Sequence, residues 1–210
     1  MSGVRIDRLV TSGTFSLDGG TWDVENNVWI VGNDDECVII DPAHDADAVA
    51  GAVAGRKVTA ILLTHGHDDH IGAVGKVRTL VSAPVHLNRE DWMLWEQVFP
   101  GSEPDHDISD GETFNVAGTR LVALHTPGHS PGSMCFYLES EGTVFSGDTL
   151  FQGGPGATGR SYSDFPTIID SIRNRVLTLP SGTVVRTGHG DTTTVGAEAP
   201  QLQEWIKRAH

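Results

Sequence analysis

Short apolar runs separated by turn residues mark most of the strands that this sequence predicts. Residues 27–31 and 37–40 are rich in β-branched and apolar side chains and flank the polar turn 32–35, which predicts a hairpin. The run 58–63 has the same character and predicts a buried strand. Further strands are expected at residues 113–116, 120–124, 134–138, 143–145 and 183–186.

Longer segments with helical periodicity lie between these strands. They cover residues 45–54, 70–80, 89–99, 164–177 and 196–208. The two halves of the chain repeat a similar order of elements, which favours an α/β fold with two sheets packed face to face and helices outside. A single mixed sheet is the alternative. No linker-like stretch interrupts the chain, so residues 1–210 are expected to form one domain.

The charge of the chain narrows its expected partners. It carries 14 Lys and Arg against 28 Asp and Glu, a formal net charge of −14, which repels nucleic-acid phosphates and anionic lipid surfaces. Charged residues at the start and the lack of an apolar run of about 20 residues argue against a secretory signal and a transmembrane helix. We therefore expect a cytoplasmic protein. Cys37 and Cys135 lie in apolar segments and are expected to be buried thiols.

The sequence Thr-His-Gly-His-Asp-Asp-His at residues 64–70 directly follows the strand 58–63 and holds four potential metal ligands. His65 and His67 are two positions apart in an extended segment, so both imidazoles can bind one ion. Asp69 and His70 follow on the turn and can bind a second ion about 3.5–4 Å away, the separation that two-metal hydrolases use. A polar turn that caps the next helix is the alternative, but a cap does not require three histidines.

A second ion needs ligands from elsewhere in the chain. His129, Asp148 and His189 each follow a predicted strand and are set among glycines, which let the backbone turn sharply beside an ion. Loops at strand ends are also where binding sites concentrate. Taken singly, each residue is as well explained by helix capping or solvation. Their joint occurrence favours a role as ligands.

Together these motifs resemble the metallo-β-lactamase superfamily. They read Thr-His-Gly-His-Asp-Asp-His, Thr-Pro-Gly-His-Ser-Pro-Gly, Gly-Asp-Thr-Leu-Phe and Gly-His-Gly. Within that superfamily the chain is similar to the glyoxalase II group, the hydroxyacylglutathione hydrolase-like thioester hydrolases. The resemblance implies a four-layer αββα sandwich with the site at one edge between the sheets. It also implies a first metal held by His65, His67 and His129, a second held by Asp69, His70 and His189, and Asp148 bridging the two.

The implied cofactors are two divalent metal ions, with zinc expected and iron or manganese as alternatives, since imidazole and carboxylate ligands suit all three. Two such ions lower the pKa of a water that then attacks a polarised carbonyl. A thiol of pKa about 8.5 leaves with little need of a proton, so a small-molecule thioester is a well-matched substrate. Asp69 is the expected catalytic residue, because it is both a ligand and a hydrogen-bond acceptor for the nucleophile.

Other reactions on the same fold are alternatives. A persulfide dioxygenase of this fold uses one iron and would need only His65, His129 and Asp148. A lactonase is a further possibility within hydrolysis, and a β-lactamase is less expected in the cytoplasm. A non-catalytic binding module is disfavoured by the complete set of ligand candidates. The sequence does not assign an oligomeric state.

Two segments are candidates for the walls of a substrate site. In the glycine-rich loop after Asp148, Arg160 is a candidate for binding a substrate carboxylate and Tyr162 for a hydrogen bond to the thiol carrier, although a salt bridge is an equal alternative for Arg160. In the segment 89–99 one helical face carries aromatic residues that suit either the core or an apolar substrate wall, namely Trp92, Trp95 and Phe99. Only residues 190–210 follow His189, whereas full-length glyoxalase II enzymes carry a C-terminal helical domain that supplies much of the glutathione site. A low-molecular-weight thiol other than glutathione is therefore a candidate carrier.

The remaining acidic and histidine residues near these motifs have other expected roles. Asp41 ends a strand before Pro42 and is a candidate for orienting a ligand histidine, or else it only starts a turn. Asp68 is expected to be solvated or to cap a helix. Five histidines match no ligand position of the family and are expected in ordinary surface or core roles, namely His44, His86, His106, His125 and His210.

Overall fold

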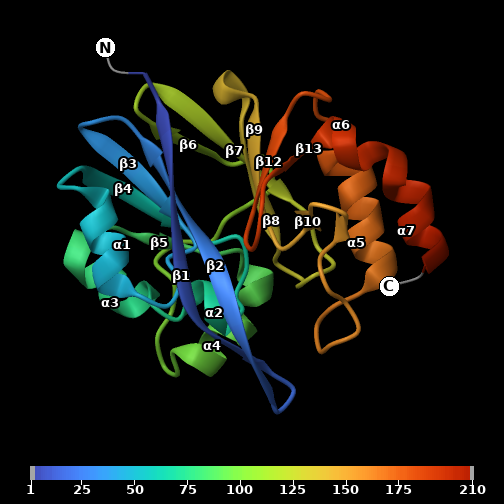
Figure 1. The fold of residues 1–210 in the computed structure, drawn as a ribbon. Coiled ribbons are helices and arrows are strands. Elements are labelled where there is room, and N and C mark those ends of the chain that lie inside the picture. Colours follow the sequence, from blue (N-terminus) through green and yellow to red (C-terminus); the bar gives the residue numbers. More distant parts are fainter. Residues whose placement is uncertain (1–2, 209–210) are drawn as a thin grey trace.

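The computed structural model describes residues 3–208 and contains two large β-sheets (Figure 1). The first has five strands in the order β1 (Arg5–Leu17), β2 (Gly20–Gly32), β3 (Glu36–Ile40), β4 (Lys57–Leu62) and β5 (Val85–His86). Neighbours among β1, β2 and β3 are antiparallel, whereas β4 runs parallel to both β3 and β5. The antiparallel β2–β3 pair is the hairpin that the sequence predicts.

The second sheet has six strands. Their order across the sheet is β13 (Thr193–Thr194), β12 (Val184–Thr187), β9 (Thr143–Gly147), β8 (Met134–Leu138), β7 (Thr119–His125) and β6 (Thr113–Val116). The β9–β12 pair is parallel and the other pairs are antiparallel. A small separate sheet is formed by β10 (Leu150–Phe151) and β11 (Gly154–Pro155). The five strands predicted for this half are therefore confirmed.

Helices lie on the outer faces of both sheets, with α1 and α3 on one side of the molecule and α5 and α7 on the other (Figure 1). The helices are α1 (Ala46–Val53), α2 (Asp68–Ile71), α3 (Val74–Val81), α4 (Trp92–Val98), α5 (Phe165–Ser171), α6 (Val195–Glu198) and α7 (Leu202–Arg208). A π-helix, η3 (Ile172–Val176), extends α5, and short 3₁₀ helices are η1 (Arg89–Asp91), η2 (Glu139–Glu141) and η4 (Ala199–Gln201). No helix within residues 3–208 is long and apolar enough to cross a membrane.

Alternating side chains of the strands build three separate layers of core. Ile30 and Ile39 belong to the layer between the first sheet and its helices, whereas their neighbours Trp29 and Ile40 belong to the layer between the two sheets. A third layer joins the second sheet to the C-terminal helices and includes Trp205. The αββα sandwich is thereby confirmed, and the alternative of a single mixed sheet is wrong. Cys37 and Cys135 are both buried free thiols, as expected.

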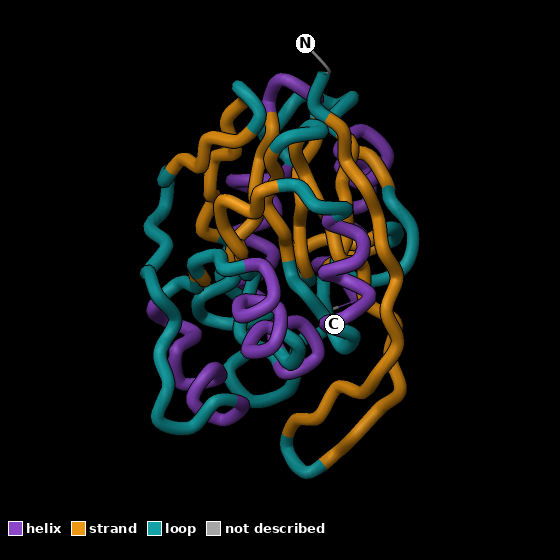
Figure 2. The backbone as a smooth tube through the Cα atoms, turned by 90° about the vertical axis from the view of Figure 1, so that its left-hand side faces the viewer, coloured by secondary structure: helices purple, strands orange, loops and turns teal. Residues whose placement is uncertain are grey.

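The main error of the sequence prediction is the N-terminal hairpin. The sequence pattern assigned no strand before residue 27, yet β1 and the first half of β2 form a long two-stranded ribbon that extends beyond the body of the protein (Figure 2). The two strands meet at the two-residue turn Asp18-Gly19, where both residues have positive φ. This geometry suits an Asp-Gly turn. The strand was missed because all of its residues except Thr11 are exposed or only partly buried, so its apolar positions are few.

Three predicted helices are correct in place but not continuous. The segment 70–80 is divided into α2 and α3 at Gly72–Ala73, and the segment 196–208 into α6, η4 and α7. Glycine favours helix less than other residues except proline, and Pro200 lies in η4. The segment 89–99 begins with η1 before α4, and Asn88 caps η1 by accepting a hydrogen bond from Glu90 N.

Candidate metal centre

The sequence 64–70 lies where β4 ends and α2 begins. Asp41, at the end of β3, accepts hydrogen bonds from Thr64 N at 2.7 Å and from Thr64 Oγ1 at 2.6 Å. Because the Thr64 hydroxyl proton goes to Asp41, the hydroxyl accepts a hydrogen bond from His65 Nδ1 at 3.0 Å. This chain of bonds leaves the Nε2 lone pair of His65 free, and that atom is buried without a hydrogen-bond partner among the described residues.

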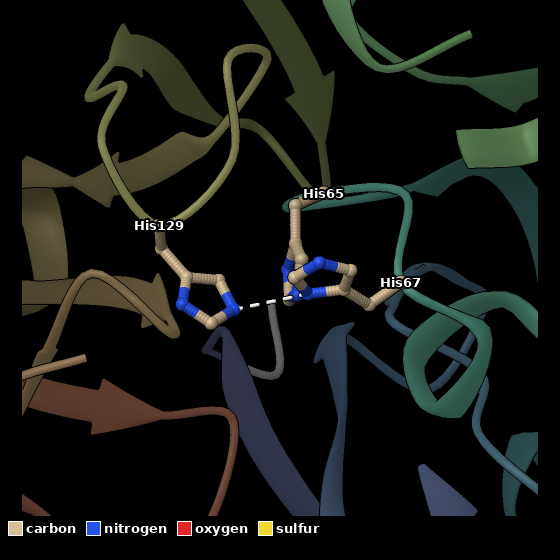
Figure 3. Close-up of side chains that lie close together, drawn as sticks. All are labelled: His65, His67 and His129. Atoms are coloured by element: carbon tan, nitrogen blue, oxygen red, sulfur yellow. Dashed lines mark hydrogen bonds between the residues drawn. The ribbon is translucent and has the colours of Figure 1, made fainter. Parts of the chain in front are cut away.

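Three buried histidines form the first cluster. His65, His67 and His129 each place one ring nitrogen within 4.8 Å of the other two (Figure 3). His129 Nδ1 donates to Ala157 O at 2.9 Å, which leaves its Nε2 facing His67 Nδ1 at 3.1 Å. Two imidazole nitrogens turned toward each other beside an unpartnered third are the donor set of a divalent metal site.

A second cluster lies next to the first and combines Asp69, His70 and His189. Asp69 Oδ2 is 3.5 Å from His70 Nε2 and 3.3 Å from His189 Nε2. The other ring nitrogen of each histidine has an outer partner, because His70 Nδ1 donates to Asp41 at 2.9 Å and His189 Nδ1 donates to Glu25 O at 2.7 Å. Such partners orient a ligand histidine and set its tautomer.

Asp148 lies between the two clusters and contacts both. Its Oδ2 is 3.6 Å from His129 Nε2 and 3.3 Å from His189 Nε2, while its Oδ1 is 3.3 Å from His70 Nε2. A Cβ at position 188 would collide with Asp148 Oδ1. The loop that carries His189 can therefore lie this close to Asp148 only because residue 188 is glycine. The structure therefore brings all seven ligand candidates together, from segments that follow strands of both sheets.

Electrostatics of the first cluster suit a cation. Burial lowers the pKa of His67 to about 3 and that of His65 well below its usual value, and the neighbouring histidines act in the same direction. Both rings are therefore neutral near pH 7 and offer a lone pair.

The second cluster and Asp148 together hold two ionised carboxylates. Burial opposes ionisation of Asp69, but His70 and His189 outweigh it and lower the pKa of Asp69 to about 2. In the same way these histidines hold the pKa of Asp148 well below its usual range. Burial opposes protonation of His189, yet Asp148 and Asp69 raise its pKa to about 10. Two buried carboxylates thus draw positive charge to this point, and a divalent cation satisfies them as protons do.

The cavity beside the clusters has a volume of about 210 Å³ and an apolar wall that comes from the N-terminal hairpin. The lining residues other than the metal-ligand candidates are Phe15, Leu17, Trp22, Val24, Ala157, Arg160, Ser161 and Ser163. Arg160 is the one Lys or Arg among the described residues that line it. Its guanidinium carbon lies 3.8 Å from the ring centroid of Trp22 and 5.3 Å from that of Phe15, and its Nη1 is buried without a partner among residues 3–208.

The other candidates for substrate contact lie elsewhere. Tyr162 is half exposed with a φ of 70° and lines a neighbouring depression rather than the cavity, so its substrate role stays a prediction. Trp95 is buried in the core between the first sheet and its helices, and Trp92 and Phe99 pack against the same layer. The core interpretation of that aromatic face is therefore confirmed. The apolar wall of the cavity is formed by the N-terminal hairpin and not by α4.

Sequence reasoning missed two supporting contacts, those of Asn26 and His44. Asn26 Nδ2 donates to Asp69 Oδ2 at 3.0 Å, and its Oδ1 pairs with His44 Nε2 at 2.7 Å, so His44 supports a residue that orients Asp69. No spacing in the sequence indicates this contact. The Asp18-Gly19 turn, by contrast, was a signal for the hairpin and hence for its aromatic residues.

The remaining expectations are settled by their contacts. Asp41 orients His70, as described above, rather than merely starting a turn. Asp68 begins α2 and accepts a hydrogen bond from Ser16 N, outside both clusters. The rings of His86 and His106 contact each other at a tilt, and neither residue belongs to a ligand cluster. His125 Nε2 pairs with Pro131 O. His210 lies outside the described residues.

Comparison with known proteins places this arrangement in a family. The model of the "Metallo-beta-lactamase superfamily" matches residues 21–189, which span every ligand candidate. The chain belongs to the metallo-β-lactamase superfamily. It is therefore a member of a superfamily of metallo-hydrolases, as its motifs predict.

Similar proteins in that superfamily carry different descriptions. A Haemophilus influenzae protein described as hydroxyacylglutathione hydrolase GloC is 32% identical over 192 residues, covering 84% of this chain and 86% of its own. Among solved structures, the BLEG-1 B3 metallo-beta-lactamase matches with a TM-score of 0.77 and 34% identity, covering 90% of this chain and 97% of its own. A di-iron-bound form of TTHA1623 matches with a TM-score of 0.73 and 32% identity, covering 90% and 96%.

Proposed function

We propose that this protein is a dinuclear metal-dependent hydrolase that cleaves a thioester of a low-molecular-weight thiol into a carboxylic acid and the free thiol. The observation that carries the proposal is the pair of ligand clusters with Asp148 between them. One cluster alone would suit a single-metal enzyme. Two clusters in contact through one carboxylate suit a two-metal hydrolase.

The donor set fits two divalent ions, with His65, His67 and His129 at one, Asp69, His70 and His189 at the other, and Asp148 between. Zinc is the expected metal, and iron is the first alternative because a structural relative is described in a di-iron form. When bound, the ions supply a water of lowered pKa and a Lewis acid for the carbonyl oxygen.

The chain itself contributes orientation. Asp69 accepts the hydrogen bond of the attacking water, and Asn26 holds the Asp69 carboxylate in place. The histidines and aspartates that line the cavity are all metal-ligand candidates, so the described lining residues include no separate acid to protonate a leaving group. A thiolate, whose conjugate acid has a pKa of about 8.5, departs without one. This match favours thioesters over esters and amides.

The cavity suggests the character of the thiol carrier. Its hairpin wall is apolar, and Arg160, which stacks on Trp22 of that wall, adds one positive charge to the lining. A thiol that carries a carboxylate beyond the scissile bond fits this combination. The relative named as a hydroxyacylglutathione hydrolase supports a thiol of the glutathione kind.

A hydrolysis screen on purified protein of defined metal content tests the proposal. The panel holds acyl thioesters of several thiols, a lactone and a β-lactam, with oxygen uptake recorded on a glutathione persulfide. Thioester turnover that is lost on chelation and restored by zinc is the expected result. Oxygen consumption with a single iron per chain would instead identify a persulfide dioxygenase, and turnover of the lactone or β-lactam alone would overturn the thioester assignment.

A further inference from the structure

We propose that Asp91 is a positioning residue for the first metal, because its one carboxylate holds together the two loops that carry His65, His67 and His129. This proposal rests on the metal centre proposed above. Asp91 ends η1 and precedes α4, in a segment that supplies no ligand candidate, and its side chain is fully buried.

Both carboxylate oxygens are used in this link. Asp91 Oδ2 accepts hydrogen bonds from Gly66 N at 2.9 Å and from Ser130 Oγ at 2.6 Å, and Oδ1 accepts from Gly132 N at 2.6 Å. Gly66 lies between His65 and His67, and Ser130 directly follows His129. One carboxylate therefore holds both loops of the first cluster, the loop of His65 and His67 and the loop of His129.

Two glycines are explained by this close approach. A Cβ at Gly66 would lie 2.9 Å from Asp91 O, and a Cβ at Gly132 would lie 2.8 Å from Asp91 Cγ. Neither glycine has a positive φ, so their backbone conformations alone do not require glycine. Both positions instead need the space that Asp91 occupies.

The second cluster is supported by other groups. Asn26 holds Asp69, Asp41 holds His70, and Glu25 O holds His189. The hydrogen bonds that the Asp91 carboxylate accepts all come from the loops of the first cluster. Loss of the Asp91 carboxylate is therefore expected to weaken the first metal site and leave the second intact.

Asp91→Asn tests this expectation with little change in size. An amide has one acceptor oxygen, so its NH₂ group must face either Gly132 N–H or Gly66 N–H, and the hydrogen bond from that glycine is lost. Changes in such outer partners typically weaken metal binding by about 10–100-fold. Zn²⁺ titration in competition with a chromophoric chelator is expected to show two tight sites in the wild-type protein and one in Asp91→Asn.

Two further variants separate positioning from folding. Ser130→Ala removes one of the three hydrogen bonds and is expected to weaken the first site by a smaller factor, which keeps the test open if Asp91→Asn does not fold. Asp107→Asn is the matched control. Asp107 accepts a hydrogen bond at 2.7 Å from the backbone N–H of Arg89, which lies on the same short helix as Asp91, but it does not bind the ligand loops. It is expected to leave both sites unchanged. Melting of the chelated proteins records any loss of stability without metal.

The outcomes distinguish the two proposals. If the wild-type protein binds no Zn²⁺ tightly, the metal centre itself is wrong and the role of Asp91 falls with it. If the wild type binds two ions and Asp91→Asn binds both as tightly, only the role of Asp91 is overturned. Equal weakening of both sites with a lower melting temperature of the chelated variant would assign Asp91 to general stability and also overturn it.

Discussion

Arg160 lines the cavity with part of its guanidinium buried, which is unusual for an arginine on a surface loop. Its guanidinium stacks on Trp22, and its buried Nη1 lacks a hydrogen-bond partner among the described residues. Buried polar groups normally have partners, so an unpaired donor beside an open cavity points to a ligand. The salt bridge considered from the sequence is replaced by this aromatic stack.

Replacement of Arg160 by Met keeps most of the side-chain bulk and removes the charge. A hydrogen bond to a charged group contributes about 1.5–3 kcal/mol, so KM for a thioester of a carboxylated thiol is expected to rise by about 10–100-fold. The kcat value and the KM for a matched neutral thioester should change little. Initial-rate kinetics with the two substrates measure this difference.

Tyr162→Phe tests the other substrate-contact candidate of the same loop. Tyr162 does not line the cavity, and only if its predicted hydrogen bond to the thiol carrier forms will KM rise for both thioesters in this variant. An equal rise in KM for charged and neutral substrates in Arg160→Met would contradict a role in carboxylate binding.

Asp69 is the residue whose loss should affect chemistry most. Asp69→Asn removes a charged ligand and the acceptor for the attacking water, and we expect kcat to fall by at least about 100-fold, within the range for loss of one such group. The first site should keep part of its metal, because Asp69 is not in that cluster. Metal content and kcat are measured on the same sample, and full activity with normal metal content would contradict the assignment.

At the scale of elements, two tryptophans have different roles because they lie in different elements. Trp95 in α4 is 2% exposed and belongs to the core, whereas Trp22 in the hairpin is 41% exposed and lines the cavity. Trp95→Ala is expected to lower the free energy of unfolding by about 3–5 kcal/mol with KM unchanged. Trp22→Ala should cost much less stability and raise KM.

Urea unfolding and thioester kinetics on both variants check this pair. Each variant is the control for the other, because the substitution is the same and only the location differs. A large rise in KM for folded Trp95→Ala would restore α4 as a substrate wall.

The elements that the sequence predicted well share one property. Strands such as β6 and β8 have alternating or continuous apolar residues, because one or both of their faces are buried. β1 has neither pattern, since as an edge strand of an extended hairpin it is stabilised by pairing along its whole length with β2. Pairing between backbones leaves little mark on side-chain composition.

At the scale of the whole molecule, the centre joins the two sheets. The residues from 65 to 70 follow β4 of the first sheet, while His129, Asp148 and His189 lie in loops of the second. A metal that binds only the folded arrangement stabilises it by about 2.7 kcal/mol when its concentration is 100 times its Kd. The proposed ions therefore contribute to the stability of the sandwich as well as to catalysis.

Metal removal should accordingly lower the melting temperature. For a chain of this length about 1 kcal/mol corresponds to about 2–4 °C, so chelation is expected to lower Tm by about 5–10 °C relative to the metal-loaded protein. Readdition of Zn²⁺ should restore it. Thermal melting followed by circular dichroism measures the change, and an unchanged Tm despite verified metal loss would contradict the linking role.

The sequence by itself determined the ligand candidates and most of the strands and helices, because metal-binding side chains at fixed spacings and buried strands leave direct marks on residue type. It favoured two packed sheets but left a single mixed sheet open, and the structure decided between them. The heptad 64–70, His129, Asp148 and His189 could all be named without coordinates, and the structure brings them together. Only the tertiary structure decided the supporting contacts. Asn26 meets Asp69 across 43 positions and Asp91 meets Gly132 across 41, and such pairs depend on how the sheets pack rather than on local spacing. The cavity wall was decided in the same way, since a half-exposed hairpin becomes a wall only when it folds over the site.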